Sequence, residues 1–172
     1  MKRFFLIFAS IWALALGCKK APPPAQQTPP PAREQTTFLV LAFPGEDLLL
    51  HRETREVPEL PPNPEAQAKV VLRELFAGPR GPFAPVAWWP AEVQEVFHDG
   101  QGVFFVNLAP APPSTVGSAG ELALQAAVAT TLALNLKNVK AVQLLFQGKE
   151  VATLGHLDLS SPAPPRWELL AP

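Results

Sequence analysis

The segment KKAPPPAQQTPPPAREQT, residues 19 to 36, limits which part of this chain can fold. It contains six prolines and no large apolar side chain, so it has nothing to bury in a hydrophobic core. Such a sequence favours the extended polyproline II conformation, with a rise of about 3.1 Å per residue, and could span at most roughly 50 Å. The folded domain is therefore predicted to occupy residues 37–172.

The N-terminus has the pattern of a secretory leader. Lys2 and Arg3 precede an uncharged apolar run, FFLIFASIWALAL, and this order of charge and hydrophobicity is typical of a signal peptide. A permanent membrane-spanning helix needs about 20 consecutive apolar residues, so this run is short for that role. We expect residues 1–17 to be a signal peptide.

The only cysteine of the chain follows this run. The stretch Ala15-Leu16-Gly17-Cys18 resembles the lipobox of bacterial lipoproteins, Leu-Ala-Gly-Cys, with leucine and alanine exchanged. The resemblance implies cleavage before Cys18 and acylation, by palmitate or a similar chain, of this cysteine. Residues 18–36 would then join the lipid to the domain, on the extracytoplasmic side of a cell membrane, periplasmic or at the cell surface. An ordinary secretory leader cut elsewhere, or an uncleaved anchor, is the alternative.

The charge balance argues against a nucleic-acid partner. Without Lys2 and Arg3 the chain has 12 basic and 15 acidic residues, and the basic residues do not cluster. Nucleic-acid binding proteins carry a concentrated basic surface. We therefore expect partners of another kind.

Hydrophobic patterns predict six strands and two helices in the order β-β-α-β-β-α-β-β. The segments are strands 38–43 and 48–57 around a turn, a helix at 62–79, a strand pair at 93–109, a helix at 119–136 and a strand pair at 139–155. This alternation in pairs predicts an α+β fold, a mainly antiparallel sheet with two helices packed on one face.

The two helices differ in character. The first has Asn63 as a candidate N-cap, Pro64 at its first position and Gly78 at its end. The second is apolar nearly all round, which is typical of a helix buried inside a protein. A membrane span is its alternative, disfavoured by its polar residues. Ser118 is the candidate cap of this second helix.

Several short motifs follow one another in a family-like order. They are Leu75 to Pro79 at the end of the first helix, Pro90, the Asp99-Gly100 turn with Val106 and Leu108, Gly120-Glu121, Thr131-Leu132, and Val139, Val142 and Gly148. In order and spacing they resemble the GerMN domain of sporulation and germination proteins and envelope lipoproteins. The resemblance implies an extracytoplasmic, non-catalytic domain linked to envelope or spore-coat assembly, without catalytic residues.

No catalytic or metal-binding motif is evident in the chain. His51, His98 and His156 lie in separate segments, and none forms a close ligand pair. The chain has neither a G-x-S-x-G motif nor a phosphate-binding G-K-[ST] loop. We therefore expect no enzyme, no metal site and no cofactor.

Adjacent tryptophans mark the candidate binding site. Tryptophan is enriched in binding hot spots, and loops often carry function. We expect Trp89 to fill the core. Trp88 is the candidate binding residue, although it could equally cover a loop.

These observations predict a lipid-anchored, non-enzymatic domain that binds an envelope protein or assembles with copies of itself. The alternative is a peptidoglycan-binding module, or an accessory to cell-wall hydrolases, that presents Trp88 to wall glycans. A third hypothesis is an unrecognised hydrolase that depends on His98 or Asp99.

Overall fold

The computed structural model describes residues 36–114 and 117–172. The predicted signal peptide, the lipidation of Cys18 and the proline-rich linker fall outside these ranges. They remain predictions.

The order of elements along the chain follows the predicted alternation. The elements are β1 (Thr36–Pro44), β2 (Leu50–Pro58), α1 (Pro64–Phe76), β3 (Glu92–His98), β4 (Val103–Ala109), α2 (Ser118–Asn135), β5 (Ala141–Phe146), β6 (Lys149–Glu150), β7 (Thr153–Leu154), β8 (Leu157–Asp158) and the 3-10 helix η1 (Trp167–Leu169). The two helices and the first six strands match the predicted segments. The second predicted strand of the pair at 139–155 is divided between β6 and β7, and β8 and the helix η1 were not among the predicted segments.

The strands form three sheets. β1 and β2 form an antiparallel hairpin, β3, β4, β5 and β6 form a four-stranded sheet in that order, and β7 pairs with β8. Among the strands of the described residues, β4 pairs with β5 in parallel and the other pairings are antiparallel. Parallel neighbours need a long crossover connection, and α2 provides it here. The predicted α+β class with mainly antiparallel pairing is confirmed, and the strands divide between sheets.

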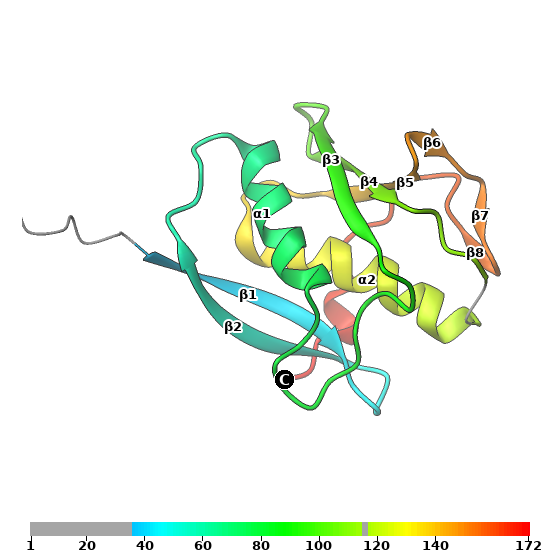
Figure 1. Cartoon of the computed structure of the whole chain (residues 1–172), viewed down its shortest axis with the longest axis horizontal. Helices are drawn as coiled ribbons and strands as arrows, with labels where there is room; N and C mark the ends of the chain where they lie inside the picture. The colour runs from blue at the N-terminus through cyan, green and yellow to red at the C-terminus, as the bar shows by residue number, and fades with distance from the viewer. Residues whose placement is uncertain (1–35, 115–116) are drawn as a thin grey trace, which may run out of the picture. The chain divides into compact units, whose positions relative to one another are not determined.

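The two helices form a layer between the hairpin and the four-stranded sheet (Figure 1). α1 packs against β1 and β3, and α2 packs against β1 and β5. The helices thus cover one face of the four-stranded sheet, as expected, and the hairpin lies on their other side. This arrangement buries the middle of α2, including residues 124–132.

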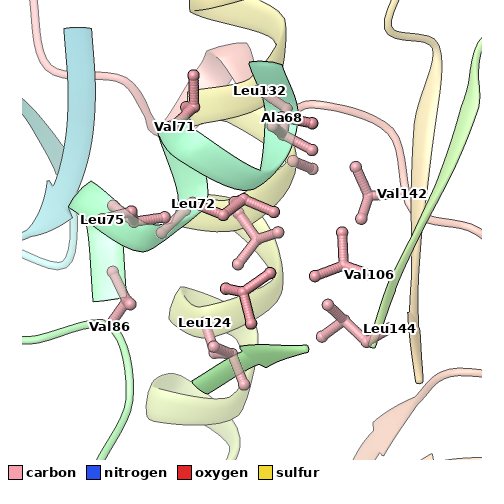
Figure 2. Close-up of a cluster of buried hydrophobic side chains, with 14 of the residues drawn as sticks. Ala68, Val71, Leu72, Leu75, Val86, Val106, Leu124, Leu132, Val142 and Leu144 are labelled. Atoms are coloured by element: carbon pink, nitrogen blue, oxygen red, sulfur yellow. The ribbon is translucent and has the colours of Figure 1, made fainter. Parts of the chain in front are cut away.

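The hydrophobic core lies where the helices meet the sheet (Figure 2). Leu72 of α1 and Leu124 and Leu132 of α2 are fully buried in one cluster. Val106 of β4 and Leu144 of β5 point toward them from the sheet. Each such side chain contributes roughly 1.5–3 kcal/mol on burial, which fixes the helices on the sheet.

Local sequence signals explain the ends of α1. The side chain of Asn63 accepts a hydrogen bond from the backbone N–H of Ala66, and Pro64 occupies the first helical turn. Gly78, just past the C-cap Ala77, has a φ of 89°, a conformation that glycine adopts without steric cost. The prediction of both ends is confirmed.

Polar side chains of the buried helix α2 complete the free edge of β1. Thr131 accepts the N–H of Ala42, and Asn135 both accepts the N–H of Val40 and donates to its carbonyl. A buried backbone group without a partner costs roughly 1–3 kcal/mol. These polar residues therefore replace a missing strand partner.

The C-terminal segment contacts the four-stranded sheet, the helix α2 and the β1–β2 hairpin in turn. Ala163 bridges to Val142 on the edge of β5, and Leu170 bridges to Leu50 at the start of β2. Between these points the N–H of Arg166 donates to the hydroxyl of Thr130 on α2. The helix η1 is held in place by these contacts.

Two expectations about α2 have different outcomes. Its predicted burial is confirmed, and among the described residues no helix is long and apolar enough to cross a membrane. The expected cap at Ser118 is wrong, because Gly117 is the N-cap, and among the described residues no side chain caps this end. Gly117 has a φ of 94°, and glycine meets that backbone requirement without steric cost.

The turn between β7 and β8 packs against a buried carboxylate. Glu121 of α2 is fully buried, its Oε2 accepts the N–H of His156, and a Cβ added to Gly155 would lie 2.6 Å from its Cδ.

We expect Gly155→Ala to lower the free energy of unfolding by about 2 kcal/mol. The alanine would have to adopt a positive φ, and its Cβ would overlap with the Glu121 carboxylate. Gly148→Ala is the control, since Gly148 has a positive φ and open space around it. Urea unfolding should show about half the loss there, and equal losses would contradict this contact.

Candidate functional site: an apolar groove beside the N-terminal end of α2

Two adjoining apolar hollows form a groove at the start of α2. Both are lined by Pro44 at the end of β1 and by Gly120 and Ala123 of α2. Their volumes are about 350 Å³ and 270 Å³. The small side chains of α2 leave this space open, because a larger residue at either position would fill it.

Leucines and a tryptophan form the walls of the groove. Leu48, Leu50 and Leu169 line the first hollow, and Trp88 lines the second together with the loop segment 84–87. Three separate parts of the chain thus meet here, the β1–β2 turn, the loop before β3 and the C-terminal helix η1. The groove exists only in the folded domain.

Leu48 is the most unusual residue of the groove. It is 74 % exposed and has a φ of 65°, although a leucine in this left-handed conformation costs roughly 1–2 kcal/mol. Hydrogen bonds across the turn, from Leu48 N–H to Gly45 O and from Gly45 N–H to Leu49 O, hold it there. Strained residues of this kind gather at ligand contacts.

We expect Leu48→Gly to raise the free energy of unfolding by about 1 kcal/mol, because glycine relieves the positive φ and little buried surface is lost. Urea unfolding followed by circular dichroism measures this change. Leu49→Gly in the same turn is the control and should be destabilising. A loss of stability in Leu48→Gly would show that the side chain serves the fold.

The two tryptophans have different surroundings. Trp89 is buried, its ring lies 6.3 Å from that of Phe146 at a tilt of 52°, and its indole N–H donates to the carbonyl of Pro110. Trp88 is half-buried, meets Trp89 edge-on and donates to the carbonyl of Ser114. The core role expected of Trp89 is confirmed. Trp88 both covers the loop 110–114 and lines the groove, so a binding role for it remains a prediction.

The rim of the groove at the β1–β2 turn is acidic. Glu46 is exposed, and Asp47 contacts the His51 ring, with its Oδ1 3.0 Å from Nε2. The hydrogen bond from His51 lowers the pKa of Asp47, and the N–H of Leu49 adds to this effect. Two carboxylates therefore lie beside an apolar surface.

The residues considered for metal binding or hydrolysis do not converge. His51 pairs with Asp47, His98 stacks on Phe104 at 4.5 Å, and His156 lies on the β7–β8 turn. In residues 36–114 and 117–172 no group of three or more His, Cys, Asp or Glu side chains is placed to hold a metal ion. The carboxylate of Asp99 accepts the N–H groups of Gln101 and Val103 and so shapes the β3–β4 turn.

Sequence reasoning located Trp88 but missed Leu48 and the small residues of α2. One signal for Leu48 was available. Three consecutive leucines, residues 48 to 50, enter a strand in which successive side chains point to opposite faces. At least one of them must therefore face away from the hairpin's inner side. No comparable signal marks Gly120 or Ala123, whose role depends on the loop packed opposite them.

A helix layer between a hairpin and a mixed sheet, with an open apolar groove at one end, defines a small α+β domain. The family model described as "Germane: Sporulation and spore germination" matches residues 41–152, and the chain belongs to this family. The predicted GerMN resemblance is confirmed. A comparison with curated proteins finds no match.

Solved structures show the same fold at low sequence identity. A candidate lipoprotein from Clostridium perfringens is 16 % identical with a TM-score of 0.54, over 76 % of this chain and 87 % of that one. The tandem GerMN domains of the sporulation protein GerM from Bacillus subtilis are 15 % identical, with a TM-score of 0.54, over 76 % of this chain and 46 % of that one. The first GerMN domain of GerM alone is 17 % identical with a TM-score of 0.51, over 77 % and 98 %.

Proposed function

We propose that this chain is a lipid-anchored envelope lipoprotein whose non-catalytic domain binds an apolar segment of another envelope protein in the groove beside α2. The observation that carries this proposal is the continuous apolar lining of the groove, with Leu48 exposed at one end and Trp88 at the other. Large exposed apolar surfaces on soluble domains mark interaction sites.

The chemistry of the groove favours a protein segment over a wall glycan. Pockets that fix a polar ligand in place do so with a few well-placed polar groups. This groove is lined mainly by alanine, glycine, proline and leucine, so it offers apolar contact and few hydrogen bonds. A peptide with leucine, valine or aromatic side chains fits this lining, whereas a glycan leaves its hydroxyl groups without partners.

The charge at the rim adds a requirement on the partner. Glu46 and Asp47 lie next to the lining residues Gly45 and Leu48. Complementary charge at an interface raises the association rate and excludes like-charged competitors. The proposed partner segment therefore carries a lysine or arginine beside its apolar residues.

The lipid anchor is proposed from the lipobox-like sequence ending at Cys18, and the likeness to a candidate lipoprotein supports it. Cell fractionation of Cys18→Ser tests the anchor. The wild-type chain is expected in the membrane fraction, and the variant in the soluble extracytoplasmic fraction or as uncut precursor. A variant that is cut and retained in the membrane like the wild type would contradict lipidation at this residue.

In-cell crosslinking followed by mass spectrometry tests the groove. Ala123→Met places a longer apolar side chain at a position shared by both hollows, and Ala152→Met is the control on an exposed loop elsewhere. We expect the dominant protein crosslink to fall by at least about tenfold in Ala123→Met, which corresponds to about 1.4 kcal/mol of binding. The control should keep it. Equal yields in both variants, or recovery of wall fragments alone, would count against the proposal.

A further inference from the structure

A further hollow, of about 680 Å³, lies at the other end of α2. The first turn of α1, the β3–β4 turn and the loop that follows α2 surround it, with Gln67, His98, Gln101, Asn138, Lys137 and Lys140 among its lining residues. Since α2 has 18 residues, its two ends are roughly 27 Å apart. This hollow and the apolar groove are therefore separate surfaces.

The lining of this hollow is polar and carries positive charge. Lys137 and Lys140 contribute two ammonium groups, and the lining residues include no Asp, Glu or Arg within the part of the chain that the structure describes. The side-chain amides of Gln67, Gln101 and Asn138 add neutral hydrogen-bonding groups. Such a surface favours an anion that also bears hydroxyl groups.

Lys140 is held in place by the glycine opposite it. Its backbone N–H donates to the carbonyl of Gly102 at 2.8 Å, and its Cγ would lie 3.0 Å from a Cβ added to that glycine. The aliphatic part of the lysine therefore packs against bare backbone. This contact positions the first carbons of the side chain, while Lys140 as a whole is exposed to solvent.

The carboxylate of Asp99, between the lining residues His98 and Gly100 in the sequence, is hydrogen-bonded within its own turn. Asp99 follows His98 and accepts N–H groups from Gln101 and Val103 at 2.7 Å and 2.9 Å. The hydrogen bond from Val103 is the main reason why the pKa of Asp99 is lowered, and it outweighs the opposing effect of desolvation. The carboxylate of Asp99 is thus held by the backbone of its own turn, and neither Lys137 nor Lys140 forms an ion pair with a described residue.

We propose that this hollow binds a phosphate ester of a polyol, with Lys137 and Lys140 on the phosphate and the amide side chains on the hydroxyl groups. Lysine binds phosphate as a point charge, and this lining contains two lysines. The volume exceeds that of a single ion and suits a glycerol- or sugar-phosphate group. Such a group occurs in soluble esters and in phospholipid headgroups.

Calorimetric titration of the full-length chain in nonionic detergent micelles tests this proposal. The probes are glycerol 3-phosphate, neutral glycerol, and micelles containing phosphatidylglycerol. We expect the phosphate ester to bind, glycerol not to bind, and Lys140→Met to weaken binding at least about tenfold. Lys149→Met, at an exposed residue of β6, is the matched control and should bind as the wild type does.

The arms of the experiment separate the two sources of the phosphate. Binding of both the soluble ester and the lipid shows recognition of the headgroup chemistry, and binding of the soluble ester alone assigns a soluble ligand. Equal binding of glycerol and glycerol phosphate would overturn the proposal, as would equal losses in Lys140→Met and Lys149→Met or no binding of any phosphate probe. Loss of the groove-dependent crosslink leaves this result unaffected, because the two surfaces share no residue.

Discussion

Replacing Arg55 by methionine is expected to lower the free energy of unfolding by about 3 kcal/mol. Arg55 is only 3 % exposed, and its guanidinium bonds the carboxylate of Glu53 and the carbonyls of Glu74 and Gly78. It also lies 5.5 Å from the ring centroid of Phe43. Methionine keeps much of the volume but leaves a carboxylate and the C-terminal end of α1 without their donor.

Arg73→Met is the matched control for this prediction. Arg73 lies on the exposed face of α1, where such a change is expected to cost less than about 0.5 kcal/mol. Urea unfolding of both variants, followed by far-UV circular dichroism, measures the difference. If the two variants lose similar stability, Arg55 does not connect the hairpin to α1 in the way the structure indicates.

The same cluster gives the domain an acid-sensitive component of stability. Burial would raise the pKa of Glu53, but hydrogen bonds from Arg55 and from the N–H groups of Gly81 and Arg80 outweigh it and lower the pKa. A carboxyl with a lowered pKa in the folded state contributes stability above its usual pKa. That contribution is lost as the pH falls through the lowered value. The acid-dependent loss of stability should therefore be smaller in Arg55→Met.

Trp89→Ala is expected to cost about 4 kcal/mol, because it removes a large buried side chain and leaves the carbonyl of Pro110 without its donor. Trp88→Ala should cost less than half as much, since this side chain is half-buried. The same urea experiment compares the two neighbours.

The pair also separates stability from binding. Trp88→Ala is expected to reduce the in-cell crosslink while most of the stability is kept. A Trp88 variant that is as unstable as the Trp89 variant would show that both tryptophans serve the core and would remove Trp88 from the binding surface.

Local signals in the sequence predicted most of the fold. Asn63, Pro64 and Gly78 act through contacts within a few residues, so the ends of α1 could be derived from the sequence alone. The alternation of residues 48 to 57 predicted β2 with one exposed face, and Arg52, Thr54 and Glu56 are indeed exposed. The uniform hydrophobicity of 119–136 predicted a buried helix for the same reason.

Features that depend on distant contacts could not be predicted in this way. Arg55 lies on the buried face of β2, and its partners come from α1 and from the loop after it. The parallel pairing of β4 with β5 follows from the path of α2 across the sheet. The turn of the short β7–β8 hairpin contacts the carboxylate of Glu121, which lies 34 residues before Gly155 in the sequence.

The candidate sites show the same division. Trp88 was recognised because tryptophan in a loop is informative on its own. Leu48, Gly120 and Ala123 form a surface with it only after the hairpin, α2 and η1 have packed together. Lys137 and Lys140 likewise line a hollow only together with the β3–β4 turn opposite them. Sequence patterns indicate contacts between residues that are close along the chain. These surfaces are formed by residues that are distant in the sequence, so the patterns do not predict them.

Site-specific photo-crosslinking in cells tests the central claim most directly. A photoreactive amino acid replaces Leu48 at the groove in one strain, and Thr54 on the exposed face of β2 in another. The account predicts a single dominant protein adduct from position 48 and none from position 54. Equal adducts from both positions, or none from position 48, would contradict a protein-binding groove.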